Sequence, residues 1–273
     1  MEKCDEYRDA DIYLHHSISP EPDAGSISYS AHFHDRFELY YFIGGSGSMA
    51  VEGVSTRMEP GRCLLLCPGE THAMHVDASM PYERMALLFR DTIFTGELSP
   101  LGDSLRNRQR ALCRDDDGFI RTCLTQIFHT PVENRRCAVL VSLGAILHHL
   151  SDADTLPPDE DGGDPLVGEI IRYVNTHLGD HWDLDTLASA LYRDKSYLNR
   201  RFRATVGTTI WDYTTKKRLI AARQNMFLGG SVSAGFTGSG FSDYSSFWRQ
   251  YRSLFGLSPK DDLTAYRRQR ENS

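Results

Sequence analysis

The sequence predicts an α+β protein with an N-terminal β-barrel, a helical appendage and a C-terminal all-α domain. Short apolar runs separated by glycine and proline turns occupy residues 1–110, which is typical of a small barrel or sandwich. Helical spacing replaces that pattern in residues 111–150. After an acidic segment at 151–164, residues 165–270 twice repeat a pair of helices joined by a turn.

Charge is distributed unevenly along this chain of 273 residues, whose formal net charge is −7. Residues 165–273 hold 16 Lys and Arg against 10 Asp and Glu, a charge of +6. The first 164 residues hold 14 against 27, a charge of −13. An acidic module joined to a basic one is expected of a nucleic-acid reader, so double-stranded DNA is the predicted partner.

Neither a membrane partner nor a disulfide framework is predicted. No apolar run approaches the roughly 18 residues that span a bilayer, and the N-terminal residues lack the apolar stretch of a signal peptide. We therefore expect a cytoplasmic protein. None of the six cysteines lies in a Cys-x-x-Cys pair, so the thiols are predicted to be reduced and buried.

Three strand candidates in the N-terminal part are residues 37–43, 48–51 and 63–66. Each is a short apolar run bounded by residues that favour turns. The predicted turns are 44–47, 52–53, 59–61 and 68–70.

Two helices are predicted between residue 117 and the acidic segment. After Pro131, the second places four leucines at alternating steps of three and four, which makes a narrow apolar seam. The seam either packs against its own barrel or contacts its copy in a homodimer. The four leucines are Leu140, Leu143, Leu147 and Leu150.

Residues 151–164 are the predicted flexible linker, because they hold six acidic residues, two prolines, two glycines and no basic residue. Asp164 and Pro165 then begin a helix, with Asp164 as the N-cap.

The first helix-turn-helix is predicted from Asp183, which caps its first helix, to Gly207, which ends its second. The second helix, 195–206, turns Leu198, Phe202 and Val206 inward. Its opposite face would be exposed and could reach base edges in a major groove about 12 Å wide. The residues on that face are Ser196, Asn199, Arg200 and Arg203.

The second helix-turn-helix repeats this arrangement around Phe241 and Phe247. Trp248 either belongs to the exposed face or packs against the helix that joins the two units, residues 210–228. A rigid helix of that length could hold two reading helices about 34 Å apart, one turn of DNA. The predicted exposed face consists of Tyr244, Ser245, Trp248 and Arg249.

These motifs resemble the AraC/XylS family of bacterial transcription regulators over residues 165–268. The resemblance centres on Gly240–Asp243, Tyr244–Phe247 and Gly256–Pro259. It implies that RNA polymerase is a partner and that activation is more usual than repression. It also implies that bases are contacted by Ser196, Asn199 and Arg200 of the first motif and by Tyr244, Ser245, Trp248 and Arg249 of the second.

The chain departs from the family pattern at two places. Gly235 and Gly238 fall in the predicted helix 232–239, at a cost of roughly 1 kcal/mol each relative to Ala. The Tyr–Arg pair usual after the final proline is displaced to Tyr266–Arg267. We therefore expect the second helix-turn-helix to be the less stable one and the weaker reader.

The N-terminal half contains a candidate ligand site. His32, His34 and Glu38 would share one face of an extended strand because side chains alternate, and Tyr40 continues that face. His72 follows a Pro–Gly turn. The two segments resemble the two motifs of the cupin barrel, the usual sensor domain of AraC-type regulators, which implies a cupin-like fold for residues 1–110.

Three imidazoles and a carboxylate suit Fe(II), Mn, Ni or Zn. Without metal, the same groups would bind a polar small molecule or only one another, so no cofactor is predicted except this divalent metal as an alternative. The resemblance implies a sequence-specific regulator, not an enzyme, that responds to an effector such as a sugar or catabolite.

Two other interpretations of the whole chain remain. One is a metal-dependent cupin enzyme or metal sensor fused to a DNA-binding domain. The other is a constitutive DNA binder whose barrel only dimerises. The sequence leaves open the effector, the promoter and the sign of regulation.

Overall fold

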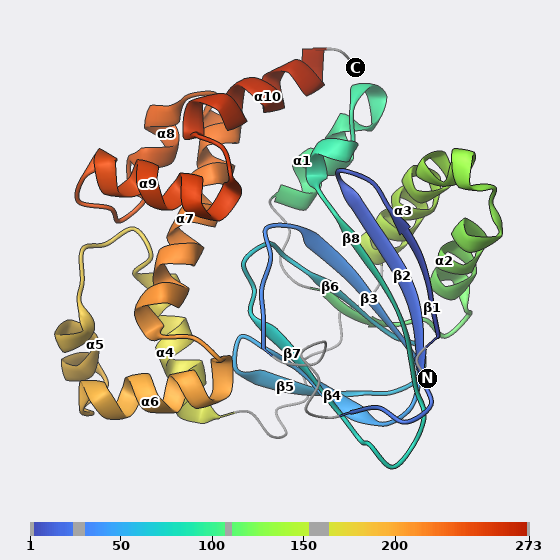
Figure 1. Ribbon diagram of the computed structural model, residues 1–273, viewed down its shortest axis with the longest axis horizontal. Helices are drawn as coiled ribbons and strands as arrows, with labels where there is room; N and C mark the ends of the chain where they lie inside the picture. Colours follow the sequence, from blue (N-terminus) through green and yellow to red (C-terminus); the bar gives the residue numbers. More distant parts are fainter. Residues whose placement is uncertain (1–2, 24–30, 107–110, 153–163, 272–273) are drawn as a thin grey trace. The chain divides into compact units, whose positions relative to one another are not determined.

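The computed structural model describes residues 3–23, 31–106, 111–152 and 164–271 (Figure 1). The chain divides into two compact units. The N-terminal unit comprises residues 1–51 and 55–162, and the C-terminal unit comprises residues 163–273 with the turn residues 52–54. Most of the predicted linker, residues 153–163, lies outside the described residues.

The N-terminal unit contains two antiparallel sheets, as the predicted fold class requires. The larger sheet has the strand order β1-β2-β8-β3-β6-β9. The smaller has the order β5-β4-β7. The strands are β1 Lys3–Arg8, β2 Ile12–Ser19, β3 Phe37–Gly44, β4 Gly47–Val51, β5 Val54–Met58, β6 Arg62–Leu66, β7 His72–Val76, β8 Tyr82–Phe89 and β9 Ala111–Arg114.

The inner faces of the two sheets enclose an apolar core. Phe42 and Leu66 of the larger sheet are fully buried there, with Met49 and Met74 of the smaller sheet. The three predicted strands correspond to β3, β4 and β6, and their predicted turns join them to their neighbours. Because successive side chains of a strand point to opposite faces of its sheet, alternate residues of these strands point into this core.

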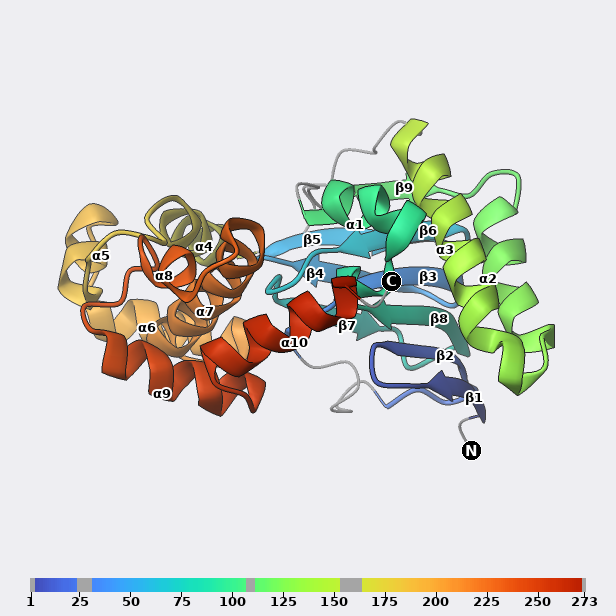
Figure 2. The same ribbon diagram turned by 90° about the horizontal axis from the view of Figure 1, so that it is seen from above.

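The other face of the larger sheet is covered by helices α2 (Phe119–His129) and α3 (Arg135–Asp152) (Figure 2). Leu143, Leu147 and Leu150 are buried in the core between these helices and the sheet, and Leu140 packs against it. The leucine seam thus packs against its own barrel. Its core is filled from within the unit, so the seam does not provide the alternative dimer contact.

The boundary predicted at residue 110 needs correction. Residues Ala111–Arg114 form β9, which pairs with β6 at the edge of the larger sheet. The helical segment begins only at Phe119, because the Asp115 carboxylate accepts hydrogen bonds from the backbone N–H groups of Ile120 and Arg121. The shorter elements of this unit are α1 Ser99–Arg106 and the 3₁₀ turns η2 Asp91–Ile93, η3 Gly96–Leu98 and η4 Val132–Asn134.

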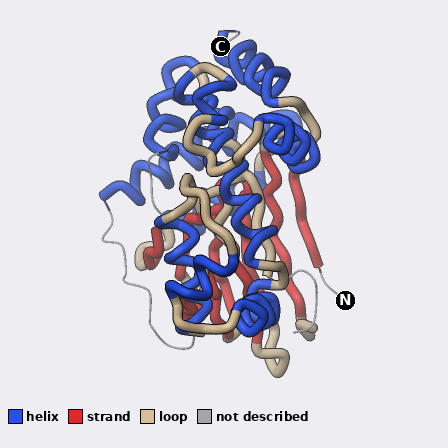
Figure 3. Tube along the Cα trace, turned by 90° about the vertical axis from the view of Figure 1, so that its left-hand side faces the viewer, coloured by secondary structure: helices blue, strands red, loops and turns tan. Residues whose placement is uncertain are grey.

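The C-terminal unit is built of helices and loops (Figure 3). As predicted, the side chains of Asp164, Asp183 and Asp194 cap helices α4, α5 and α6. The first helix-turn-helix is α5–α6, and the second is α8–α9. The helices are α4 Pro165–Thr176, α5 Leu184–Ala190, α6 Lys195–Val206, α7 Ile210–Gly229, α8 Val232–Phe236, α9 Tyr244–Phe255 and α10 Pro259–Glu271.

Each helix-turn-helix has its own core. Phe202 and Leu198 of α6 pack with Ile170 of α4 and the first turns of α7. Phe247 and Tyr251 of α9 pack with the second half of α7 and with α10. The long helix α7 therefore belongs to both cores, which joins the two motifs in one unit.

The two glycines of the second helix-turn-helix were expected only to destabilise a helix. In the structure, each has a specific role. A Cβ on Gly235 would lie 2.7 Å from the carbonyl oxygen of Ala222 and 2.8 Å from Cβ of Met226. Gly235 therefore permits α8 to approach α7 closely. The helix ends at Phe236, not at residue 239, and Gly238 lies in the following turn with φ of +74°.

No helix in the described part of the chain combines the length and the hydrophobicity that crossing a membrane requires.

Candidate ligand and nucleic-acid sites

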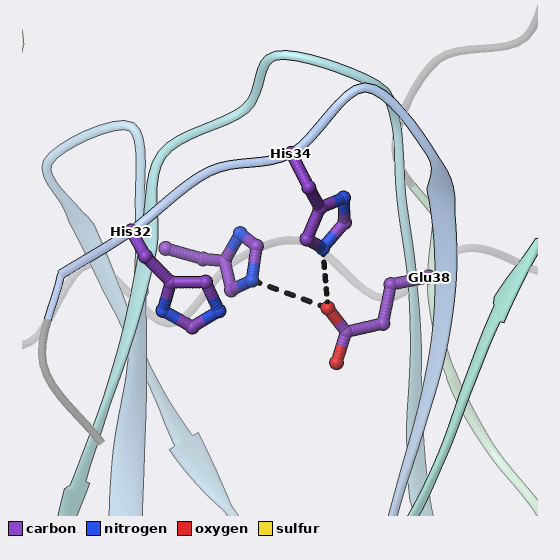
Figure 4. Close-up of side chains that lie close together, drawn as sticks. His32, His34 and Glu38 are labelled. Carbon is purple, nitrogen blue, oxygen red and sulfur yellow. Dashed lines mark hydrogen bonds and ion pairs between the residues drawn. The ribbon is translucent and has the colours of Figure 1, made fainter. Parts of the chain in front are cut away.

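The structure brings the four predicted histidine and glutamate residues together in the N-terminal unit (Figure 4). One nitrogen or oxygen ligand atom from each of His32, His34, Glu38 and His72 lies within 4.8 Å of the others. Backbone hydrogen bonds of 3.0 and 2.9 Å join His32 to His72. Two distant segments of the chain are thereby held side by side.

The local structure differs from the extended strand predicted for residues 32–38. Strand β3 begins only at Phe37, and His34 lies in the loop before it. The loop turns because Nδ1 of His34 bonds to the carbonyl oxygen of Arg36 at 2.9 Å. His34 and Glu38 still meet, but through this turn and not through strand alternation.

Hydrogen bonds to the backbone fix how the imidazoles of His34 and His72 are oriented. A carbonyl oxygen only accepts, so Nδ1 of His34 donates to Arg36, and Nδ1 of His72 donates to Glu70 at 2.9 Å. The two Nε2 atoms then lie 2.8 and 3.2 Å from the same oxygen of Glu38. This arrangement directs two potential ligand nitrogens at one point.

The electrostatics of the cluster favour an ionised Glu38. Burial alone would raise the pKa of this carboxyl, but hydrogen bonds from His34 and His72 outweigh burial and lower it well below its usual range. For His72, burial would lower the pKa, and contact with Glu38 raises it instead. Glu38 thus carries a charge that these imidazoles, or a cation in their place, can balance.

Tyr40 shares the inner face with Glu38 but does not join the cluster. Its hydroxyl bonds to the hydroxyl of Tyr82, and both side chains are buried. The guanidinium of Arg84 lies 5.9 Å from the Tyr40 ring and 5.7 Å from the Tyr82 ring. Burial, with Arg84 nearby, lowers the pKa of His15 to about 4, so His15 is neutral at pH 7.

No local pattern in the sequence singles out Tyr82, Arg84 and His15. They join Tyr40 because β2 and β8 pair beside β3, where His15 lies opposite Ala86 and Ala86 lies opposite Tyr40. Such pairing of distant strands is not visible in local patterns.

Helix α6 presents the predicted exposed face. Ser196, Arg200 and Arg203 are exposed, while Leu198, Phe202 and Val206 are buried. The guanidinium of Arg200 lies 5.9 Å from the ring of Tyr197, which is itself 41% exposed. As predicted, the helix begins after its N-cap Asp194 and ends at the left-handed Gly207, whose φ is +79°.

Asn199, the fourth residue predicted on that face, is placed differently. It is half-buried, and its side-chain oxygen accepts a hydrogen bond of 3.0 Å from the backbone N–H of Ile210. That N–H is at the first residue of α7 and has no partner within its helix. The side chain therefore joins α6 to the start of α7, and its oxygen is already engaged.

Helix α9 presents Tyr244, Ser245 and Arg249 to solvent, as predicted. Trp248 is half-buried, and the guanidinium of Arg252 lies 5.4 Å from its ring. The indole is therefore partly covered by a neighbour on its own helix, and it is less exposed than Tyr244, Ser245 and Arg249.

A buried ionic network supports α9 from behind. The Asp262 carboxylate accepts hydrogen bonds of 2.7 and 3.0 Å from Arg223 of α7, and one of 2.6 Å from the hydroxyl of Tyr251. Burial, with Asp262 beside it, raises the pKa of Tyr251 far above its usual value. Asp262 is thus a buried residue of the second core.

Two family models match the chain. The AraC-like ligand binding domain matches residues 21–134, and a helix-turn-helix domain matches residues 187–268. The first range includes the histidine–glutamate cluster, and the second includes α6 and α9.

Two relatives share sequence with parts of the chain. The regulatory protein PocR of Salmonella typhimurium is 28% identical over 112 residues, which cover 40% of this chain and 36% of PocR. A putative AraC-like transcription regulator of Streptomyces antibioticus is 24% identical over 143 residues, 50% of this chain and 47% of that protein. The chain thus spans less than half the length of either.

Solved structures also resemble the chain. ToxT of Vibrio cholerae with a bound unsaturated fatty acid has 13% identity and a TM-score of 0.39, and covers 94% of this chain and 96% of its own. The DNA-binding domain of AdpA in complex with a target DNA has 27% identity and a TM-score of 0.36, and covers 41% of this chain and 100% of its own.

Proposed function

Because this chain belongs to the AraC-type family of transcription regulators, we propose that α6 and α9 bind promoter DNA under the control of a ligand in the N-terminal unit. The single observation behind this proposal is that two capped helices each present an exposed polar and basic face. The positive charge of residues 165–273 supports it, since phosphate neutralisation dominates DNA affinity.

In this proposal the base-contacting side chains are Ser196 and Arg200 of α6, with Ser245 and Arg249 of α9. Arg203, Tyr244 and Trp248 border those positions. Arginine pairs best with guanine, and the serine hydroxyls can form hydrogen bonds with several different bases. Homodimerisation, contact with RNA polymerase and activation complete the proposal, on the family resemblance.

Selection of fragments of the host genome by the purified full chain tests DNA recognition. We expect a small set of promoter fragments to be enriched over random competitor, with an affinity that falls steeply as salt rises. Enrichment of no fragment, or an affinity indifferent to salt, would contradict the proposal. Arg57→Ala, an exposed arginine of β5, is the control that should leave selection unchanged.

The ligand proposed for the N-terminal unit is a small-molecule effector held by the groups around Glu38. A specific observation favours a divalent metal as a second candidate. Three imidazoles and one carboxylate converge, and backbone acceptors hold Nδ1 of His34 and His72 so that their Nε2 atoms are directed at one point.

The residues present fit such an ion. His32, His34, His72 and Glu38 would hold it, and a bound Fe(II), Mn, Ni or Zn would supply a Lewis acid at which an effector oxygen could bind. Glu38 supplies the negative charge, and the buried Nε2 of His72 supplies a nitrogen that lies 3.2 Å from its carboxylate.

Metal analysis of the full chain separates these candidates. The metal-sensor proposal expects about one equivalent of metal, lost in Glu38→Gln and His72→Ala, and operator affinity that changes when a chelator removes the metal. The small-molecule proposal expects no stoichiometric metal. We propose a regulator and not an enzyme; substrate turnover that is abolished by His34→Ala would overturn that.

A further inference from the structure

The turn of the first helix-turn-helix holds a tyrosine in a conformation that favours glycine. Tyr192 lies between α5 and α6 with φ of +53°. Its backbone N–H bonds to the carbonyl oxygen of Ser189, and the next N–H bonds to that of Ala188. These bonds end α5 with Tyr192 in the left-handed conformation. Glycine or asparagine usually occupies such a position, because a Cβ is unfavourable there.

The second helix-turn-helix makes the corresponding turn with glycines. After α8 ends at Phe236, the left-handed positions before α9 are Gly238 and Gly240, with φ of +74° and +76°. The chain therefore uses glycine where only the turn matters. Nothing in the fold requires an aromatic residue at position 192.

The Tyr192 side chain also gains nothing within the described part of the chain. It is 88% exposed, more than any other large hydrophobic side chain that the structure describes. It forms no hydrogen bond or ring contact with another described residue. The left-handed conformation costs free energy that no side-chain contact of Tyr192 among the described residues offsets, which directs attention to a partner outside the chain.

The surroundings of Tyr192 indicate which partner that is. Arg193 is exposed beside it, and Lys195 and Ser196 are exposed at the start of α6. In helix-turn-helix proteins the second helix enters the major groove while the preceding helix crosses the sugar–phosphate backbone. Tyrosine hydroxyls are among the groups that bond to phosphates, which position the protein without reading sequence.

We propose that Tyr192 contacts the DNA backbone at the edge of the groove that α6 enters, with its ring against a sugar and its hydroxyl donating to a phosphate oxygen. The contact rests on the proposed function, since it exists only if α6 binds DNA. It would fix how deeply α6 enters the groove. Tyr192 is thus a positioning residue, distinct from the base-contacting residues.

Three variants of the full chain test this on a promoter fragment that the wild type selects. Tyr192→Gly should unfold at a temperature no lower than the wild type, because it relieves the left-handed backbone, and should bind about tenfold more weakly. Tyr192→Phe should bind about threefold more weakly with an unchanged slope of log affinity against log salt, because the lost donor is uncharged. Arg193→Ala should reduce that slope by about 1.

Tyr173→Phe, on α4, is the matched control and should leave affinity unchanged. Wild-type affinity in Tyr192→Gly would overturn the proposal. So would unchanged affinity with altered transcription, which would assign Tyr192 to a protein partner. Failure of the wild type itself to select any fragment would instead contradict the proposed function, and the two failures are therefore distinguishable.

Discussion

The two helix-turn-helix motifs present similar outer faces but are held together differently. The first rests on an apolar core shared with α4, and its α6 is joined to α7 by the Asn199 side chain. The second has a shorter first helix, pressed against α7 at Gly235, and a buried carboxylate that joins α7, α9 and α10. The difference teaches that two helices can present similar exposed faces while one apolar core is supplemented by a buried ionic network and the other is not.

The difference also alters the expectation that the second motif is the weaker one. That expectation counted two glycines as helix costs, yet Gly238 lies outside the helix and Gly235 allows close packing. Whether the second motif is less stable therefore depends on the ionic network, which variants of the full chain can measure.

The largest effect is expected from Asp262→Ala. This variant loses the carboxylate that accepts hydrogen bonds from Arg223 and Tyr251. The side chains of Arg223 and Tyr251 are themselves mostly buried. Removing one partner of a buried ion pair costs roughly 3–5 kcal/mol of unfolding free energy. Denaturant unfolding checks this, with Asp185→Ala, which breaks the exposed pair with Lys195, as a control that should leave the curve unchanged. Equal losses in the two variants would show that the second core does not depend on its ionic network.

A smaller loss is expected from Gly235→Ala. The added Cβ would approach the Ala222 carbonyl oxygen and Met226, so overpacking should cost about 1–3 kcal/mol in the same unfolding experiment. Gly168→Ala on α4 is the matched control. Among the described residues, no atom beyond its chain neighbours and the backbone of its own helix lies within 4 Å of its Cβ position, so alanine there should stabilise the chain by about 0.5–1 kcal/mol. A stabilising Gly235→Ala would restore the idea that this glycine is only a cost.

The reading faces are compared by Arg200→Ala and Arg249→Ala, measured as affinity for a selected promoter fragment. Each should cost about 1–3 kcal/mol and relax the base preference at one position. We expect the larger loss for Arg200, because α6 belongs to the motif whose support does not depend on a buried ion pair. Equal losses would show that the two motifs read DNA with equal strength.

The smallest effect is expected from Asn199→Ala, which removes the acceptor for the Ile210 N–H. Loss of such a cap costs about 1 kcal/mol of stability. Asn199→Asp keeps an acceptor and should unfold like the wild type. If Asn199→Ala leaves stability unchanged but alters base preference, Asn199 belongs with the base-contacting residues after all.

Local signals in the sequence predicted much of the C-terminal unit. The caps Asp183 and Asp194, the glycine after α6 and the buried positions of α6 all follow from short-range spacing. Asn199 did not follow, because its orientation depends on where α7 begins, eleven residues later. Asp262 likewise gains its role only through contact with Arg223, 39 residues away.

Strand alternation predicted that His32, His34 and Glu38 share one face, and the resemblance to the cupin motifs linked them to His72. His72 reaches His32 through a backbone bridge between distant segments, which no local pattern contains. The loop at His34 replaced the expected strand, yet the cluster formed because backbone acceptors orient the imidazoles. The pairing of β2 and β8 that places Arg84 near Tyr40 was equally beyond local patterns.

The uninterrupted helix α7 has a consequence for the spacing of the two motifs along a duplex. Each residue of an α-helix advances it by 1.5 Å and turns it by about 100°. A single residue inserted midway along α7 would therefore swing α9 about a quarter of a circle away from its orientation relative to α6. In the proposed complex with DNA, any change in the length of α7 would therefore alter the angular phase between the two half-sites that α6 and α9 contact.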